Sequence, residues 1–350
     1  KQIVEKVSPS VVGVHSSFTT SSGTSTGTGT GIILSDDGYI ITNAHVVQTE
    51  VSEYVSNNNN SGRYGSNPFS GGGDIFDYFF GGSGIGGSYQ KKLKQADTVK
   101  IVLSTDEDTE YEAEIVGADE NSDLAVLKIK PDSDLPAATL GDSDNLSLGD
   151  DVVVIGNPLG LETSVSKGVV SGLNRQVYDD NSVSAIQTDT AINSGNSGGG
   201  MFNMYGEVVG VVNMKLVNDN AENLGFAITI NDAKTVISDL ITKGYVTGRP
   251  ILGITCLQVS DYLGAIQGMT PGLLVTDIDK SLAIANSELV VGDTITAING
   301  TEVRSVDEVS EVIKDMKPGD TVTVTVVRTD SRGRDKTVKF DVQLSEYSGS

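Results

Sequence analysis

Gly195-Asn196-Ser197-Gly198-Gly199 is the stretch on which the interpretation of this chain depends. Its serine lies in a run of glycines, where the backbone can turn sharply and present both a hydroxyl and an N–H group. Upstream, His45 ends the segment Thr42-Asn43-Ala44-His45, which closes one apolar run. Asp123 opens a second apolar run, in Asn121-Ser122-Asp123-Leu124-Ala125-Val126. The order along the chain is therefore His, Asp, Ser, with gaps of 78 and 74 residues.

This order of residue types is one of three known chain orders of the serine-hydrolase triad, and double β-barrel proteases use it. Each piece alone has an ordinary structural explanation, because a glycine-flanked serine is usually a turn and an aspartate before a strand is commonly a cap. A lone histidine is usually structural as well, but this chain has only His15 and His45. The three pieces together, in this order, predict hydrolysis by nucleophilic catalysis.

The composition bounds the fold class and the partners. A chain of 350 residues has room for two or three domains. Apolar residues make up 37% of it, and 41 glycines without a tryptophan are typical of a β-rich protein with many turns. The formal net charge of −23 argues against nucleic acid and anionic membrane surfaces as partners. Two histidines and one cysteine are too few for a transition-metal site, and no cofactor motif occurs, so we expect neither group.

The single cysteine, Cys256, excludes an intrachain disulfide. It lies in an apolar run, which favours a buried small hydrophobe over a reactive thiol. A chain without disulfides fits a cytosolic protein, and equally a bacterial extracytoplasmic protein that needs none. No stretch reaches the roughly 18 apolar residues of a membrane helix. The chain begins at Lys1 rather than Met, which is consistent with a leader or anchor removed upstream.

The N-terminal region predicts strands around the histidine. Residues 3–14 predict a helical turn followed by a strand, and 16–31, almost wholly Ser, Thr and Gly, predict a flexible connection. Two apolar segments flank Asp36-Asp37-Gly38, a hairpin turn signal. This hairpin places His45 just beyond the end of a strand.

Residues 48–96 form a long insertion rich in Asn, Gly and Ser. One interpretation is a disordered linker. However, the insertion carries four of the eight phenylalanines of the chain, and disordered segments are poor in aromatic residues. The segment 75–80 therefore favours a docking patch on flexible arms. The four phenylalanines are Phe69, Phe76, Phe79 and Phe80.

Short apolar runs separated by Gly, Asp and Asn follow, with the spacing of a β-barrel or sandwich. They occur at 99–103, 124–129, 152–155, 208–212 and 224–228. Residues 231–243 instead have apolar positions at helical spacing, followed by Gly244, and predict a helix that closes the first unit.

A second unit begins near Gly248. Ser305 and Glu308 form a capping box, and Val306, Val309, Val312, Ile313 and Met316 would make the apolar face of the helix that follows. The segments 321–328 and 337–344 alternate polar and apolar residues, as half-buried strands do. These features predict a small α+β module.

With these motifs the chain resembles the HtrA/DegP serine proteases of the Gram-positive type, over nearly its whole length except the 48–96 insertion. The motifs that carry the resemblance are Gly29-Thr30-Gly31-Ile32-Ile33, Thr42-Asn43-Ala44-His45-Val46-Val47, Ser122-Asp123-Leu124-Ala125-Val126-Leu127, Gly156-Asn157-Pro158-Leu159-Gly160, Thr188-Asp189-Thr190-Ala191-Ile192-Asn193-Ser194-Gly195-Asn196-Ser197-Gly198-Gly199 and Leu224-Gly225-Phe226-Ala227-Ile228.

The resemblance implies a mainly β protein, with a chymotrypsin-like double β-barrel protease domain over 1–247 and a PDZ domain over 248–346. It implies that Ser197 is the nucleophile, that His45 is the general base and that Asp123 orients the histidine. The N–H groups of Gly195 and Ser197 would form the oxyanion hole, with Asn196 shaping the turn.

The resemblance also indicates where substrates would bind. Ile192, Met214 and Leu216 are candidates for a pocket that suits a small or medium aliphatic side chain, although ordinary core packing explains them equally well. In the PDZ region, Leu252-Gly253-Ile254 matches the loop that receives a peptide C-terminal carboxylate, and the strand after it would pair with the peptide. The segments 286–290 and 263–269 depart from the pattern of relatives, which leaves the ligand preference open.

The activity that follows from the resemblance is ATP-independent cleavage of misfolded or mislocalised proteins outside the cytoplasm. The chain would be at the cell surface, secreted or periplasmic, and would form a homotrimer or a larger homo-oligomer. Unfolded proteins and peptide C-termini would be its partners, with no nucleic acid and no membrane contact within this chain. The alternative is a peptide-binding chaperone or scaffold whose protease site is resting or incompetent.

Overall fold

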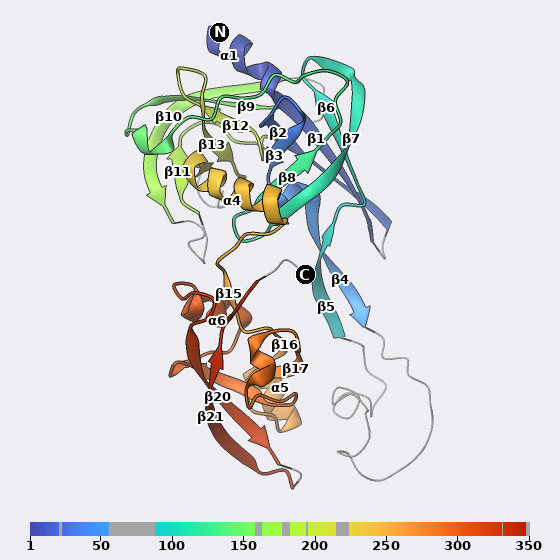
Figure 1. Cartoon of the computed structure of the whole chain (residues 1–350), viewed down its shortest axis with the longest axis vertical. Coiled ribbons are helices and arrows are strands. Elements are labelled where there is room, and N and C mark those ends of the chain that lie inside the picture. The colour runs from blue at the N-terminus through green and yellow to red at the C-terminus, as the bar shows by residue number, and fades with distance from the viewer. Residues whose placement is uncertain are drawn as a thin grey trace. The chain divides into compact units, whose positions relative to one another are not determined.

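Two closed β-barrels dominate the computed structural model (Figure 1). It describes residues 1–20, 23–55, 88–157, 163–176, 183–193, 195–214, 224–330 and 332–347. Backbone contacts group the chain into two compact units, one holding both barrels and the other holding most of the chain from Thr247 onward. The predicted fold class, a mainly β protein with a double-barrel domain followed by an α+β module, is confirmed.

The first barrel closes in the order β1-β2-β3-β8-β7-β6, with every neighbouring pair antiparallel. A short helix, α1 (Gln2–Val7), and the turn η1 (Ser8–Ser10) precede it. Its strands are β1 (Val11–Thr20), β2 (Gly23–Ile33), β3 (Tyr39–Thr42), β6 (Thr98–Leu103), β7 (Asp106–Asp119) and β8 (Leu124–Lys128). The helix α2 (Ala44–Val47) follows β3 directly, so the predicted hairpin does place His45 just past a strand end.

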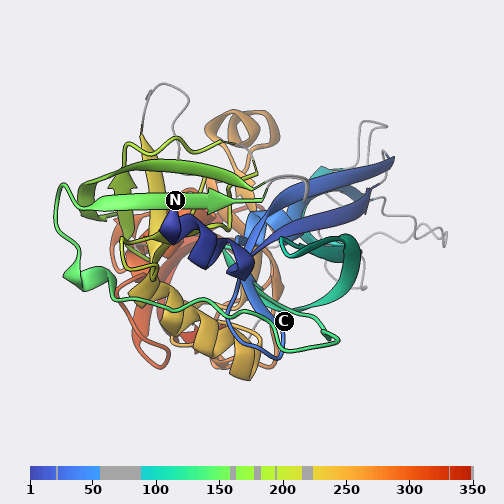
Figure 2. The same ribbon diagram turned by 90° about the horizontal axis from the view of Figure 1, so that it is seen from above.

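The second barrel closes in the order β10-β11-β14-β13-β12-β9. Its strands are β9 (Asp151–Gly156), β10 (Ser164–Arg175), β11 (Ala185–Thr188), β12 (Gly200–Phe202), β13 (Val208–Val212) and β14 (Gly225–Thr229). The turn η2 (Ser143–Asn145) precedes it. Seen from above, the blue and teal strands of the first barrel and the green strands of the second lie side by side (Figure 2).

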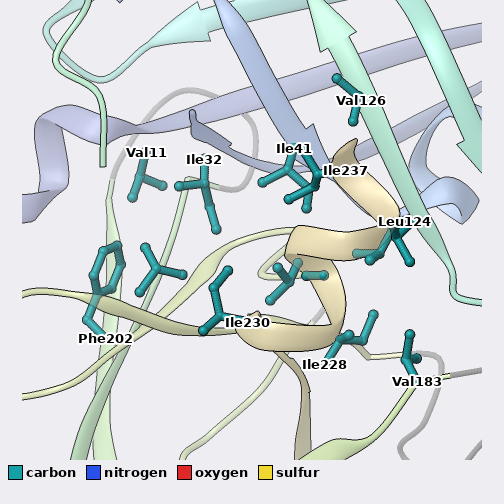
Figure 3. Packing of buried hydrophobic residues seen from close by; sticks show 14 of the residues in the cluster. Val11, Ile32, Ile41, Leu124, Val126, Val183, Phe202, Ile228, Ile230 and Ile237 are labelled. Atoms are coloured by element: carbon teal, nitrogen blue, oxygen red, sulfur yellow. The ribbon is translucent and has the colours of Figure 1, made fainter. Parts of the chain in front are cut away.

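The two barrels share one hydrophobic core, which fixes their relative position. Helix α4 (Ile230–Lys243) follows the last strand of the second barrel and ends at Gly244, whose φ of 82° suits the left-handed cap of a helix. Side chains from both barrels and from α4 form a single buried cluster. Figure 3 shows them meeting, with Val11, Ile32, Ile41 and Leu124 from the first barrel, Phe202 and Ile228 from the second, and Ile230 and Ile237 from the helix.

The prediction of a flexible connection over residues 16–31 was wrong. Apart from 21–22, which lie outside the described residues, this segment belongs to β1 and β2, paired in unbroken register from Val11 and Ile32 to Thr20 and Gly23. The glycines at 27, 29 and 31 lie on one face of β2, because alternate residues of a strand point the same way. A Cβ at Gly29 would collide with Val46, so glycine serves close packing here rather than flexibility.

The ends of the 48–96 insertion are also ordered. β4 (Gln48–Val55) and β5 (Ser88–Gln95) form a two-stranded sheet at the two ends of the segment. The aromatic patch predicted to dock, with Phe69, Phe76, Phe79 and Phe80, lies outside the described residues. The docking patch therefore stays a prediction.

The second unit is built on a sheet in the order β16-β17-β18-β20-β21, with β19 paired to β18 and a separate β15-β22 pair. Ser305 caps α6 by accepting a hydrogen bond from the Glu308 N–H, as predicted. Val306 is 58% exposed and does not belong to the predicted apolar face, whereas Met316 lies past the helix end but still packs against the core of this unit. The elements are β15 (Pro250–Ile251), β16 (Ile254–Val259), α5 (Asp261–Gln267), β17 (Gly272–Ile278), η4 (Ala283–Asn286), β18 (Thr294–Ile298), β19 (Thr301–Glu302), α6 (Val306–Ile313), β20 (Thr321–Thr329), β21 (Asp335–Gln343) and β22 (Ser345–Glu346).

Across the described residues of both units, no helix combines the length and the apolar character needed to cross a membrane.

Candidate active site

His45 lies on α2, the short helix that comes after β3. Asn43 caps this helix in an extended conformation, and its side-chain amide donates to the Asp123 carbonyl over 2.9 Å. The Ala44 N–H donates to the same carbonyl over 3.1 Å. The beginning of the helix is thus tied to the chain around Asp123, and the His45 side chain remains 29% exposed.

Asp123 is buried to 1% exposure and is held at the turn before β8. Its φ of 52° lies in the left-handed region, which aspartate tolerates better than most residues. Asp119 supports this turn, because its carboxylate accepts from the Ser122 N–H over 2.8 Å. In this conformation the Asp123 carbonyl and the carboxylate both face the helix that carries His45.

The Asp123 carboxylate accepts three hydrogen bonds from two residues. His45 Nδ1 lies 2.6 Å from Oδ2, and the His45 N–H donates to Oδ1 over 2.9 Å. The Asn213 amide donates to the same Oδ2 over 2.7 Å. These donors are neutral when the imidazole is neutral, and among the described residues no lysine or arginine pairs with Asp123. The carboxylate is therefore placed to stabilise a positive charge that develops on the imidazole.

Ser197 lies on a turn that only glycine neighbours permit. Gly195 has a φ of 100° and Gly198 a φ of 83°, both in the region that L side chains avoid. A Cβ at Gly198 would collide with the Thr30 carbonyl and the Thr42 hydroxyl. The turn is fastened to β13, because the Gly198 N–H donates to the Val212 carbonyl over 2.9 Å.

Adjacent residues after β13 bring the serine and the aspartate together. Asn213 donates to the Asp123 carboxylate, and the next residue, Met214, donates its N–H to Ser197 Oγ over 3.3 Å. Among the described residues this is the one hydrogen bond that Ser197 Oγ makes, and no hydrogen bond joins Oγ to His45. The carboxylate–imidazole contact is formed, while the Ser197 hydroxyl oxygen accepts from the Met214 N–H.

Two backbone N–H groups of the serine turn remain unused. The N–H groups of Asn196, Gly198 and Gly199 donate to backbone carbonyls. Those of Gly195 and Ser197 donate to no group in the part of the chain that the structure describes. Two free donors on either side of Asn196 are the arrangement that an oxyanion hole requires.

The three predicted pocket residues are not brought together in one described site. Ile192 is partly buried against the inner cluster of the second barrel, and a Cβ at Gly225 would meet its side chain. This placement agrees with the core-packing alternative for Ile192. Met214 is half-buried beside Ser197, and Leu216 lies outside the described residues. The pocket stays a prediction.

Three polar residues of this site had no role in the sequence interpretation. Thr30 contacts the serine turn, Asn213 contacts Asp123, and Asn43 ties α2 to β8. All three are fully buried, and Asn43 and Asn213 each follow the last residue of a buried strand. A polar residue directly after an apolar run is the signal that could have identified these two.

The comparisons with known proteins agree with this geometry. Residues 29–211 match the trypsin-like peptidase domain family, and residues 250–344 match the PDZ domain family. The chain is 32% identical to the serine protease Do-like HtrA of Bacillus subtilis (strain 168), over 99% of this chain and 73% of that protein. The chain belongs to the HtrA/DegP family of serine proteases. This confirms the resemblance on which the sequence interpretation depended.

Other family members match over shorter parts of their own length. A probable periplasmic serine endoprotease DegP-like of Chlamydia trachomatis is 34% identical over 91% of this chain and 54% of that protein. The counterpart from Halomonas elongata is 36% identical over 86% of this chain and 53% of that protein. The chain thus spans about half the length of these DegP-like relatives.

Solved structures of HtrA-type proteases share the fold. The serine endoprotease from Yersinia pestis superposes with a TM-score of 0.55 at 27% identity, covering 99% of this chain and 97% of that chain. The HtrA-type protease AlgW with tripeptide gives a TM-score of 0.54 at 26% identity, covering 99% and 96%.

The PDZ region of this family member presents an edge strand beside a glycine. β16 stands at one end of its sheet, and its neighbour in the sheet order is β17. Gly253, just before β16, has a φ of 78°, and a Cβ there would collide with the Leu282 side chain. Leu252 is buried and Ile254 begins the strand, so the three predicted loop residues lie at the start of a sheet edge.

Proposed function

We propose that the chain is an ATP-independent serine endopeptidase that degrades misfolded or mislocalised proteins, with His45, Asp123 and Ser197 as its catalytic triad. The observation that carries this proposal is the contact of 2.6 Å between His45 Nδ1 and the buried Asp123 carboxylate, linked through Asn213 and Met214 to Ser197. Family membership adds support, because the relatives that the chain matches are named serine proteases.

In this mechanism Ser197 Oγ attacks the carbonyl carbon of the scissile peptide bond, and its proton passes to His45 Nε2. Asp123 holds the Nδ1–H, which leaves Nε2 free to accept that proton, and stabilises the imidazolium that results. The imidazolium then protonates the leaving amine. Water attacks the acyl-enzyme by the same route and releases the second product. Before attack, the hydroxyl must turn from the Met214 N–H toward Nε2.

The negative charge on the tetrahedral intermediate needs donors at the position where it develops. The unused N–H groups of Gly195 and Ser197 would supply them, with Asn196 holding the turn between them. Each such donor is typically worth about 2.7–4 kcal/mol of transition-state stabilisation.

The PDZ domain would bind peptide C-termini by strand addition. An incoming peptide would pair with the free edge of β16, and the backbone at Leu252, Gly253 and Ile254 would receive its carboxylate. A solved relative, AlgW, is described with a tripeptide, which supports peptide binding in this family. Unfolded proteins and exposed C-termini are the proposed partners.

The proposed location is extracytoplasmic, at the cell surface, secreted or periplasmic. The names of DegP-like relatives as periplasmic endoproteases support this assignment. We further propose a homotrimer or a larger homo-oligomer, which the mass of the purified protein in solution would test.

The direct test is digestion of an unfolded protein by matched variants. Purified wild-type protein, Ser197→Ala and Ser171→Ala are each incubated with reduced casein, and peptide release is followed by mass spectrometry. Ser171 is an exposed serine on β10, so its variant controls for the loss of a hydroxyl elsewhere. The expected result is cleavage by wild type and Ser171→Ala, and loss of at least about 10⁴-fold in Ser197→Ala.

The same experiment separates the enzyme from the chaperone alternative. Within the described residues no hydrogen bond joins Ser197 Oγ to His45, and this observation favours a protease site in its resting state. Suppression of aggregation by wild type and Ser197→Ala alike, without cleavage by either, would replace the endopeptidase proposal with a scaffold.

A further inference from the structure

Thr30 contacts the serine turn although it belongs to the other barrel. It lies on β2 of the first barrel and is fully buried. Its N–H donates to the Ser197 carbonyl over 2.8 Å, and its hydroxyl donates to the Gly195 carbonyl over 2.6 Å. One residue of the first barrel therefore holds the turn of the second barrel at two carbonyls, through its backbone N–H at Ser197 and its side chain at Gly195.

The remaining polar capacity of Thr30 is also used. Its hydroxyl oxygen accepts from the Asn157 N–H over 2.9 Å, at the end of β9. Its carbonyl accepts from the Thr42 hydroxyl over 2.7 Å. Because the hydroxyl both donates and accepts, its proton has a fixed direction toward Gly195. The hydrogen bond that the Asn157 N–H donates to the Thr30 hydroxyl oxygen thus helps to direct the hydroxyl proton toward the Gly195 carbonyl.

These bonds constrain the two unused N–H groups. The Ser197 N–H belongs to the peptide unit between Asn196 and Ser197. The Asn196 carbonyl of that unit accepts a hydrogen bond from the Gly199 N–H over 2.9 Å, which restrains the unit. The Gly195 N–H lacks such a restraint among the described residues, and a glycine backbone rotates more freely than any other. Anchoring the Gly195 carbonyl to Thr30 limits the directions in which the N–H of that residue can point.

The approach of β2 to the turn is close enough to transmit this restraint. A Cβ at Gly29 would come within 3.1 Å of the Ser197 carbonyl, and one at Gly198 would collide with the Thr30 carbonyl. The backbones therefore pack against one another with no side chain between them. A strand held this closely limits movement of the turn.

We propose that the Thr30 hydroxyl is a positioning group for the oxyanion hole: it holds the Gly195 carbonyl so that the Gly195 N–H faces the developing oxyanion. This inference rests on the proposed endopeptidase function and adds a residue to its machinery. Because the interaction matters for the tetrahedral intermediate and not for bound substrate, its loss lowers kcat and leaves KM nearly unchanged.

The test compares Thr30→Val, which keeps the shape and removes the hydroxyl, with Thr30→Ser, which keeps the hydroxyl. Thr229→Val is the matched control, since it removes a buried threonine hydroxyl in the same unit, bonded to Asp232 over 2.8 Å. The readouts are kcat and KM on a chromogenic peptide, affinity for a peptide boronate that forms a tetrahedral adduct, and the unfolding midpoint. Wild type and Ser197→Ala are assayed beside them.

The expected result for Thr30→Val is a fall in kcat of about 10²-fold, KM within about twofold, and a parallel loss of boronate affinity. Thr30→Ser should stay within about threefold of wild type. If the valine variant does not fold, Thr30→Cys carries the test, because its thiol fills the space but donates only weakly; about a tenfold fall in kcat is expected.

Equal kcat in Thr30→Val and wild type, or an equal loss in Thr229→Val, would overturn the positioning role. So would a rise in KM without a change in kcat. These outcomes require an active wild type, so they leave the proposed function standing. A wild type no more active than Ser197→Ala would instead remove the function on which the inference rests.

Discussion

Two aspartates, one in each compact unit, are equally buried but differently partnered. Asp123 in the barrels is 1% exposed, and its carboxylate accepts from His45 and Asn213. Asp293 in the PDZ region is fully buried, and Arg328 grips it with two bonds, Nε to Oδ1 at 2.6 Å and Nη2 to Oδ2 at 2.7 Å. The first carboxylate has a titratable partner, and the second has a permanent cation.

The different partners suit the two carboxylates to different roles. Hydrogen bonding to Asp293 raises the pKa of Arg328, so the guanidinium remains a cation throughout the neutral pH range. Arg328 also donates to the Glu288 carbonyl over 2.8 Å, so the Asp293–Arg328 pair holds the loop before β18 in place. Among the described residues no lysine or arginine pairs with Asp123, so in the proposed mechanism its charge is compensated when His45 takes up a proton. We therefore expect the Asp293–Arg328 pair to contribute to stability and the Asp123 carboxylate to contribute to catalysis.

Replacing the reactive carboxylate should have the largest effect. Asp123→Asn keeps the size of the side chain but removes the acceptor that fixes the His45 tautomer. We expect kcat to fall by about 10⁴-fold, with a small change in the unfolding midpoint. Kinetics on a chromogenic peptide and thermal unfolding measure the two quantities. Asp293→Asn is the matched control, and an equal loss of kcat in that variant would end the distinction between the two sites.

Removing the permanent cation should affect stability and leave chemistry intact. Arg328→Met leaves Asp293 buried and unpaired, which we expect to destabilise the PDZ unit by about 3 kcal/mol. Urea unfolding of the full chain, followed by a probe in that unit, measures the change. The double variant Arg328→Met with Asp293→Leu should recover part of the loss, because no unpaired charge remains. A loss below about 1 kcal/mol would show that the pair is not structural.

Asn213 tests whether a neutral donor to Asp123 matters. Asn213→Ala leaves Oδ2 with His45 Nδ1 as its described partner, so the carboxylate is less firmly oriented. We expect kcat to fall by about 10–10²-fold with KM little changed. The exposed Asn145→Ala serves as the control. Unchanged kcat in Asn213→Ala would mean that His45 alone orients the carboxylate.

The Cys256 thiol is a third acidic group for this comparison, and burial alone shifts its pKa. Burial raises the pKa of its thiol from 9.0 to about 11. At pH 8 its thiolate should therefore be about 100-fold scarcer in the folded protein than in the unfolded chain, and a disulfide reagent should react correspondingly more slowly. Because the folded-state pKa is raised, the neutral thiol contributes stability below pH 9, and that contribution is lost as the pH rises toward 11. Equal labelling rates in native and urea-unfolded protein would contradict this prediction.

The sequence predicted those parts of the fold and site that depend on local patterns. Apolar runs identified the central barrel strands, and Gly244 identified the end of α4, because burial and helix capping leave direct marks on residue type. The order of His45, Asp123 and Ser197 pointed to the double barrel for the same reason. His45 lies in the short helix after β3, Asp123 directly precedes β8, and Ser197 lies in a glycine turn.

What escaped prediction depends on contacts between distant segments. The glycine- and threonine-rich stretch over 16–31 seemed flexible because its residues lack bulk, yet that lack of bulk is what lets β2 pack against Val46 and the serine turn. Thr30 could not be assigned a role for the same reason, since the partners of its hydroxyl lie more than a hundred residues away. A long-range hydrogen bond leaves no pattern in one sequence.

Labelling with diisopropyl fluorophosphate tests the central claim most directly, because the reagent modifies only a serine that its histidine has activated. The wild-type protein should gain one phosphoryl group, located on Ser197 by peptide mass spectrometry. His45→Ala and Asp123→Asn should react at least about 10³-fold more slowly, while Asp293→Asn should react at the wild-type rate. Labelling of Ser197 at the same rate with and without the Asp123 carboxylate, or no labelling of the wild type, would contradict the claim that His45 and Asp123 activate this serine.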